Sequence, residues 1–103
     1  MDAFKAFFFR YYREYLSFTA SFLRDEVAAR NVTLEAFFLL WERYAEFDSE
    51  TRIKTFLYLV IRNKCMAAGP GPPPVHSGSR PVEVPASLPA DILGEILAFA
   101  DVG

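Results

Sequence analysis

The sequence predicts an all-α fold: a compact three-helix bundle, a Pro/Gly-rich tail without regular structure, and a short C-terminal helix. All seven prolines and all five glycines lie after Ala68, so the first 66 residues contain neither helix breaker. Of the 17 aromatic residues, 16 lie within the first 58 positions, which concentrates the material for a core in the same stretch. We therefore expect a helical domain over 1–66, a linker over 67–88 and an amphipathic helix over 89–100.

The first helix, expected near residues 3–24, carries an aromatic seam. Six aromatic residues step by four and three positions, a spacing that places them on one face of a helix. They are Phe4, Phe8, Tyr11, Tyr15, Phe18 and Phe22. Leu16 and Leu23 belong to a second row that widens this face, so we expect the helix to be packed from two sides. Core packing is the expected role of the seam, in preference to an aromatic cofactor box.

The second helix is expected near residues 26–46, with Asp25 as its N-cap. Its buried side is predicted to include Trp41, which we expect to pack with Phe8 of the first helix and Phe56 of the third. Its outer side carries a stripe at steps of four, three and four, formed by Glu35, Leu39, Glu42 and Glu46. A solvated face would explain the acids alone. Large apolar groups beside the carboxylates are typical of a protein interface, and these are Leu34, Phe38 and Leu39.

The third helix is expected near residues 49–65, capped by Asp48 or Ser49. Its core seam follows helical spacing and consists of Ile53, Phe56, Leu57, Val60 and Ile61. A second stripe, at steps of four, consists of Lys54, Tyr58 and Arg62, flanked by Arg52, Thr55, Asn63 and Lys64. Cations interleaved with an aromatic ring suit a single-stranded nucleic acid, whose phosphates need charge and whose bases need a stacking surface. A solvated basic face would give the same charges without requiring the tyrosine.

Charge is segregated along the chain although the formal net charge is only −2. Residues 25–50 contain seven acids and two bases, a net of −5, whereas residues 51–65 contain four bases and no acid, a net of +4. A helix suited to a basic partner is therefore followed at once by a helix suited to a polyanion.

Little in the sequence indicates an enzyme, a cofactor or a metal site. The single histidine, His76, lies in the predicted linker, and Cys65 has no histidine near it in sequence. One cysteine cannot form an intramolecular disulfide, which fits a reducing compartment. Charged residues interrupt the apolar N-terminus, so neither a signal peptide nor a membrane insertion is predicted. We expect a cytoplasmic protein.

Three motifs within Phe4–Cys65 resemble a known family. They are the run Phe37-Phe-Leu-Leu-Trp-Glu-Arg43, the Glu46-Phe47 pair, and Ile53-Lys-Thr-Phe-Leu-Tyr58 continuing into Arg62-Asn-Lys-Cys65. In order and spacing they resemble the region-two domain of bacterial sigma factors of the extracytoplasmic-function class, which direct RNA polymerase to promoters. The Phe-Asp-Ser-Glu turn and the Arg-Asn-x-Cys ending are similar to the versions common in Bacteroidetes-type bacteria.

The resemblance implies two binding surfaces and no catalytic residue. The outer face of the second helix would dock on a coiled coil of the largest subunit of core RNA polymerase, through Asn31, Leu34, Glu35, Phe38 and Glu42. The turn and third helix would open the minus-ten promoter element and hold its non-template strand, with a flipped base near the turn. The positions implied in DNA binding are Phe47, Asp48, Ser49, Arg52, Lys54, Tyr58, Arg62 and Asn63. An anti-sigma factor is a further partner that the family implies.

The chain departs from the family pattern in two respects. The usual Asp-Ile-Val-Gln-Glu run appears as Asn31-Val-Thr-Leu-Glu35, which lacks an acid and an amide, so core binding is expected to be weaker or altered. The helix-turn-helix domain that reads the minus-thirty-five element is also missing, which suggests an excised domain, a truncated product or a degenerate factor. The alternative function is therefore a helical interaction module that binds polymerase or an anti-sigma partner without recognising DNA.

Overall fold

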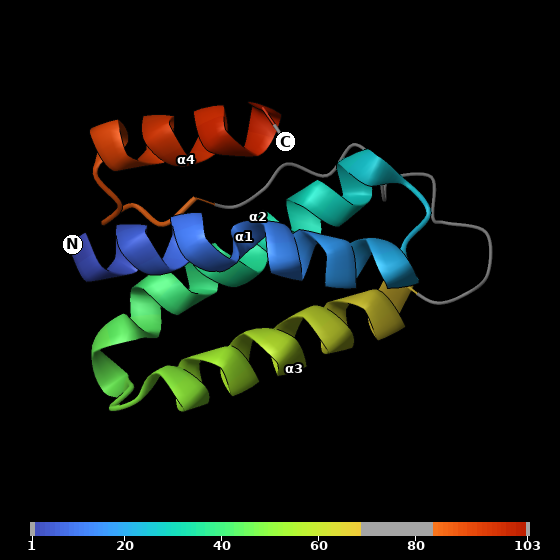
Figure 1. Ribbon diagram of the computed structural model, residues 1–103, viewed down its shortest axis with the longest axis horizontal. Helices are drawn as coiled ribbons and strands as arrows, with labels where there is room; N and C mark the ends of the chain where they lie inside the picture. Colours follow the sequence, from blue (N-terminus) through green and yellow to red (C-terminus); the bar gives the residue numbers. More distant parts are fainter. Residues whose placement is uncertain (1, 69–83, 103) are drawn as a thin grey trace.

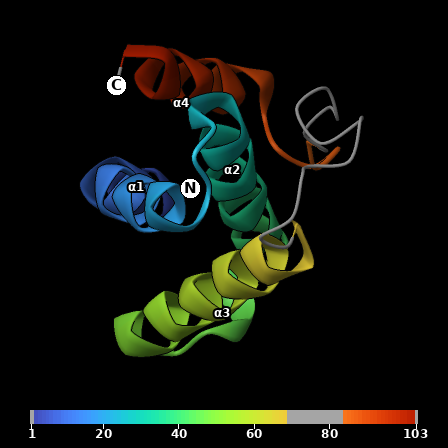
Figure 2. The same ribbon diagram turned by 90° about the vertical axis from the view of Figure 1, so that its right-hand side faces the viewer.

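The computed structural model describes residues 2–68 and 84–102, which form four α-helices, a one-turn 3-10 helix and no strand. The elements are α1 (Asp2–Phe22), α2 (Glu26–Arg43), η1 (Tyr44–Glu46), α3 (Glu50–Ala68) and α4 (Ala90–Val102). Helices α3 and α4 lie on opposite sides of α1, which pairs with α2 (Figures 1 and 2). The predicted all-α fold is confirmed. Most of the predicted linker, with His76, lies outside the described residues.

Local capping explains where α2 and α3 begin. The Asp25 carboxylate accepts hydrogen bonds from the backbone N–H groups of Val27 (2.9 Å) and Ala28 (3.3 Å), as its predicted N-cap role requires. The Ser49 hydroxyl accepts from the backbone N–H of Arg52 (3.3 Å) at the start of α3. The second helix was expected to stay α-helical to residue 46. It ends instead at Arg43, and η1 tightens the last turn before the chain reverses.

Phe37 of α2 is the centre of the core. Its ring is fully buried and meets Phe8 of α1 edge-on, with 5.0 Å between ring centroids. The prediction that Trp41 and Phe56 would be buried together with Phe8 is wrong. Both are only partly buried at the edge of the core, where Trp41 packs on Phe4 and Phe56 packs on Phe47. Their rings lie near the α2–α3 turn, whereas Phe37 of α2 and the α1 rings that contact it occupy the centre.

Two threonines form a buried polar contact between α1 and α2. The Thr33 hydroxyl oxygen lies 2.9 Å from the Thr19 hydroxyl oxygen and 2.8 Å from the Ala29 carbonyl, so its proton has two acceptors within reach. The Thr19 hydroxyl in turn donates to the Tyr15 carbonyl at 2.8 Å. Both side chains are completely buried, and these bonds satisfy hydroxyls that would otherwise destabilise the core.

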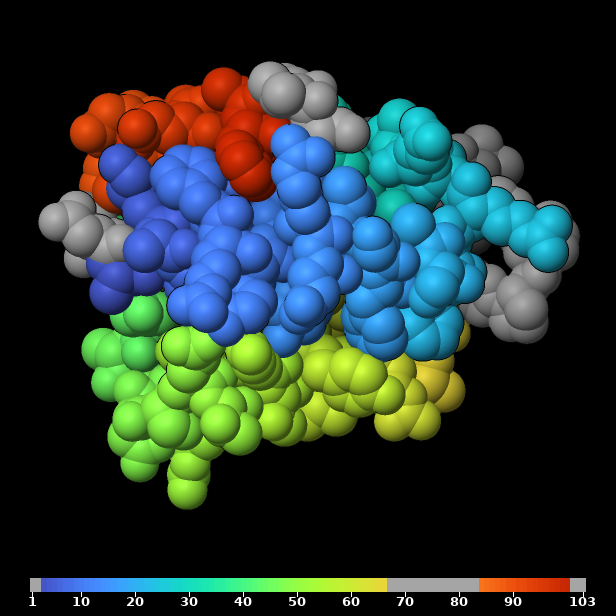
Figure 3. Space-filling model, in the orientation of Figure 1, coloured from blue at the N-terminus to red at the C-terminus, as the bar shows by residue number. Residues whose placement is uncertain are grey.

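Helix α4, for which the sequence indicated no partner, packs against α1 (Figure 3). Four apolar residues at steps of four face the bundle and are buried, namely Leu88, Ile92, Ile96 and Ala100. The Phe99 ring packs on Phe9 with 5.1 Å between centroids, and the Arg13 guanidinium carbon lies 5.2 Å from the Phe99 ring centroid. Lys5 and Glu95 form an ion pair at 2.7 Å. The C-terminal helix is thus part of the core rather than an isolated appendage.

Candidate nucleic-acid interface

The outer face of α3 presents most of the side chains that the sequence assigned to nucleic acid. Ile53, Leu57 and Ile61 are buried in the core, as their helical spacing predicted. Of the residues assigned to DNA binding, six are exposed on α3 and its preceding turn, namely Asp48, Ser49, Arg52, Tyr58, Arg62 and Asn63. Phe47 and Lys54 are half-buried. The separation of a core side from a basic, aromatic side is therefore present in the fold.

Tyr58 belongs to an aromatic platform, which we define as Phe18, Phe22 and Tyr58. The Tyr58 ring stacks on Phe18, with 5.0 Å between centroids and 26° between planes, and Phe18 meets Phe22 edge-on. Tyr58 remains 45% exposed and Phe22 48% exposed. The expectation that the aromatic seam is buried along its whole length is therefore wrong at its last turn. Sequence periodicity could not reveal this, since the spacing of Phe18 and Phe22 is the same as that of the buried rings.

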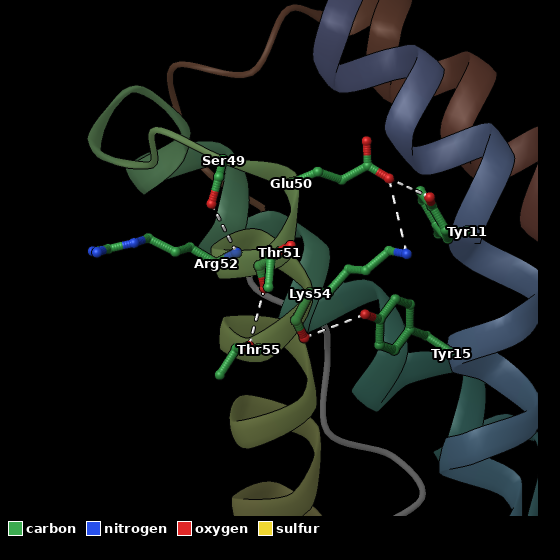
Figure 4. A network of polar contacts seen from close by, with 8 residues as sticks. All are labelled: Tyr11, Tyr15, Ser49, Glu50, Thr51, Arg52, Lys54 and Thr55. Carbon is green, nitrogen blue, oxygen red and sulfur yellow. Dashed lines mark hydrogen bonds and ion pairs between the residues drawn. The ribbon is translucent and has the colours of Figure 1, made fainter.

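A polar network joins the start of α3 to the middle of α1 (Figure 4). The Tyr11 hydroxyl donates to the Glu50 carboxylate, and the Lys54 ammonium lies 3.9 Å from the same Glu50 oxygen. The Lys54 nitrogen also lies 4.4 Å from the Tyr11 ring centroid, in cation–π contact. The Lys54 backbone carbonyl accepts a hydrogen bond from the Tyr15 hydroxyl at 3.2 Å. Lys54 is consequently in contact with α1, although its side chain remains 42% exposed, whereas its place in the stripe predicted a cation clear of the core.

The surroundings of Tyr15 keep its hydroxyl protonated, so that it can donate a hydrogen bond. Burial raises the pKa of Tyr15 from 10.0 to about 12, and the nearby Glu14 carboxylate and Tyr11 add to this rise. The phenol therefore stays protonated at neutral pH and retains its bond to the α3 backbone. This bond holds the first turns of α3 at a fixed position relative to α1.

A cavity of about 400 Å³ lies at the turn between α2 and α3, and we refer to it as the turn cavity. Its walls come from three elements and include Phe7, Arg10 and Tyr11 of α1, Tyr44 and Phe47 near the turn, and Asp48, Ser49 and Glu50 at the start of α3. The volume falls within the ~300–1,000 Å³ of small-molecule sites. Sequence reasoning identified its turn residues but did not connect them with the α1 residues, which are distant in sequence.

The predicted polymerase-binding residues of α2 divide into two groups. Glu42 is exposed and Asn31 half-buried, whereas Glu35 is half-buried and paired with Lys64 of α3 at 2.9 Å. Leu34 and Phe38 are buried, with 3% and 2% exposure, so the expectation of an exposed apolar patch is wrong for both. Of the three apolar residues, only Leu39 is exposed.

The residues that cover this part of α2 come from the C-terminal segment. Val84, Pro85 and Ala86 line a cavity of about 260 Å³ together with four α2 residues, Glu35, Phe38, Leu39 and Glu42. The Trp41 indole N–H donates to the Ser87 hydroxyl at 3.0 Å. Sequence periodicity assigned Phe38 to the outside because it could not include a segment about fifty residues away that lies beside it.

Other kinds of site find no support in residues 2–68 and 84–102. No group of three His, Cys, Asp or Glu side chains gathers there in a way that could hold a metal ion. Burial raises the pKa of the Cys65 thiol, which disfavours the thiolate needed for nucleophilic chemistry. None of the helices in this part of the chain combines the length and apolar character that a membrane span requires.

Comparison with known proteins identifies one family. The family model described as Sigma-70 region 2 matches residues 7–68, a span that covers most of α1 and all of α2, η1 and α3. The match ends where α3 ends, so α4 lies outside it. No curated protein and no solved structure matches the chain.

Proposed function

Because the chain belongs to the sigma-70 region 2 family, we propose that it binds core RNA polymerase and recognises and opens the minus-ten promoter element during transcription initiation. Region 2 of sigma factors is a non-enzymatic domain of a transcription factor. We assign the chain to the extracytoplasmic-function class, in a Bacteroidetes-like form, on the motifs quoted from its sequence. Core polymerase and the non-template strand of the promoter are its proposed partners, and it acts in the cytoplasm.

The observation that carries this proposal is the position of the turn cavity beside the exposed face of α3. The cavity is walled by Phe47, Asp48 and Ser49, the turn residues to which the resemblance assigns a flipped base. Stacking surface and polar edges occur together there, as base capture requires. Arg62 and Asn63 continue along the exposed face of α3, where the phosphates of the strand would follow.

The ion pairs of α3 favour a second candidate, an interaction module that binds polymerase or an anti-sigma factor without DNA. Arg52 pairs with Asp48 at 3.3 Å, Lys54 with Glu50 at 3.9 Å, and Lys64 with Glu35 at 2.9 Å. Three of the four cations of the helix thus already have carboxylate partners. Exposed ion pairs of this kind contribute only about 0–1 kcal/mol to stability, so the phosphates of DNA can replace the carboxylates as partners of Arg52 and Lys54. We therefore retain DNA binding as the main proposal.

Salt dependence of oligonucleotide binding separates the two candidates. The wild-type chain with core polymerase is titrated against a single-stranded minus-ten oligonucleotide at several salt concentrations. Arg62→Ala should reduce the slope of log K against log salt by about 0.7, because one phosphate contact is lost, whereas Arg62→Lys should retain the wild-type slope. A slope near zero for the wild-type chain, with polymerase bound, would leave the interaction module as the function.

Charge reversal on α2 tests the polymerase contact. Glu42→Lys should weaken binding to core polymerase, because Glu42 is exposed on the proposed docking face. Glu14→Lys is the matched control, since Glu14 is exposed on α1 and lies outside that face. Equal binding by both variants would contradict the assignment of the α2 face, and no binding by the wild-type chain would contradict the proposed function.

A further inference from the structure

The C-terminal segment lies on the α2 face that the family uses for polymerase. Residues 84–102, which we call the strap, begin after the family match ends at residue 68. Val84, Pro85 and Ala86 of the strap line one cavity with Phe38 and Glu42 of α2. The family domain is therefore present with an additional segment seated on one of its two proposed binding surfaces.

The strap contacts the helical bundle near its start, in its middle and near its end. Near its start the Ser87 hydroxyl accepts from the Trp41 indole at 3.0 Å. In the middle, Glu95 pairs with Lys5 of α1 at 2.7 Å. Towards its end the Phe99 ring packs on α1. Helix α4 packs against α1, and the buried apolar stripe of the strap consists of Leu88, Ile92, Ile96 and Ala100.

We propose that the strap is an intramolecular competitor of core polymerase, and that it must leave α2 before Phe38 can take part in docking. This inference rests on the proposed function, because it concerns the same face. In the closed state Leu39 and Glu42 are exposed and Asn31 and Glu35 are half-buried, whereas Phe38 is buried. The chain would then alternate between a closed form and a form competent to bind polymerase.

The chemistry of the strap suits an occupant that can be displaced. It contains no lysine or arginine, so it covers apolar surface without neutralising the carboxylates of α2. Glu42 remains exposed and can attract a basic partner while the strap is in place. Helix α4 has 13 residues, a length at which an isolated helix is marginal in water, so the strap gains most of its helical stability from docking.

Competition within one chain has a measurable consequence. The strap is covalently joined to the bundle, so its docking does not weaken when the protein is diluted. The apparent affinity for polymerase is reduced in proportion to the competent fraction. A competent fraction of about one tenth would weaken polymerase binding about tenfold, and release of the strap would restore that factor.

Adjacent residues of α4 provide a release variant and its control. Ile96 is completely buried, and Ile96→Asp would place a carboxylate in the apolar contact with the bundle. Leu97 is 39% exposed, so Leu97→Asp adds the same charge to the same helix without entering that contact. We expect Ile96→Asp to bind core polymerase about tenfold more tightly than the wild-type chain, and Leu97→Asp to bind as the wild-type chain does. Circular dichroism and thermal unfolding verify that α1–α3 remain folded.

A crosslink gives the opposite perturbation and is judged against the same protein before crosslinking. Lys5→Cys and Glu95→Cys, in a Cys65→Ala background, place two thiols where the ion pair joins the strap to α1. A short bismaleimide that joins them should lower polymerase affinity relative to the same protein before crosslinking. Equal or weaker binding by Ile96→Asp, or no effect of the crosslink, overturns the strap proposal while the proposed function stands. Absence of binding by every form, including the release variant, overturns the proposed function and the strap's role with it.

Discussion

Replacing Tyr58 by alanine tests whether the exposed aromatic platform binds bases. The ring is 45% exposed and stacks on Phe18 with 5.0 Å between ring centroids. Its removal should therefore change the free energy of folding and the free energy of DNA binding by different amounts. An aromatic pair contributes about 0.5–1.5 kcal/mol beyond its area, a small part of the ~5–15 kcal/mol that stabilises a domain. Loss of base stacking costs about 1–3 kcal/mol, which corresponds to roughly 5–150-fold in Kd. We therefore expect Tyr58→Ala to fold and to bind single-stranded DNA markedly more weakly.

The assay is a titration of the non-template minus-ten oligonucleotide with core polymerase present, monitored by fluorescence anisotropy. Urea unfolding, followed by circular dichroism, measures the folding cost separately. Tyr58→Phe is the matched control, because it retains the ring and should preserve both the Phe18 stack and the affinity. If a folded Tyr58→Ala chain binds the oligonucleotide as tightly as the wild-type chain, the platform is a packing feature of the surface and the stacking argument fails.

Three further predictions concern the core and its titrating groups. Leu57→Ala should lower the free energy of unfolding in urea by about 2–5 kcal/mol, because Leu57 is completely buried. Leu59→Ala, at an exposed position, should change it by no more than about 0.5 kcal/mol. Because folding raises the pKa of Tyr15 from 10.0 to about 12, its contribution to stability is complete below pH 10 and is lost as pH rises through 12. Tyr15→Phe should flatten that part of a stability–pH profile. Since burial raises the pKa of the Cys65 thiol, a thiol reagent should modify it only when urea unfolds the chain, and rapid modification of the folded protein would contradict its burial.

The helices were predictable because their signals are local. The absence of proline and glycine, the cap at Asp25 and the seam of α3 each act within a few residues, and the structure agrees with them except that Phe56 and Val60 of the seam are only partly buried. The same holds for the exposed Arg62 and Asn63, which follow from their position opposite that seam. Helical spacing alone was sufficient wherever a face has one neighbouring element.

Helical spacing gave a wrong or incomplete prediction where a segment distant in sequence lies against the same face of a helix. Phe38 was expected on the outer face of α2, yet it is buried and lines a cavity with Val84, Pro85 and Ala86 of the strap. Helical spacing places Lys54 in a stripe away from the core, yet its ammonium group contacts the Tyr11 ring and pairs with Glu50. A periodicity describes one helix at a time, so it contains no information about which distant segment will lie over that helix.

The hydroxyl contact between Thr19 and Thr33 limits how α1 and α2 can be aligned. Aromatic rings recur every three or four positions along α1, so a shift by one turn would still bring ring against ring. Such a shift would separate the two hydroxyls, now 2.9 Å apart, and would break the hydrogen bond between the helices, whereas each hydroxyl would keep its bond to the carbonyl four residues earlier in its own helix. A hydrogen bond of this kind contributes about 0.5–1.5 kcal/mol to stability. The pair therefore favours the native alignment of the two helices over neighbouring ones in a core whose rings are otherwise interchangeable.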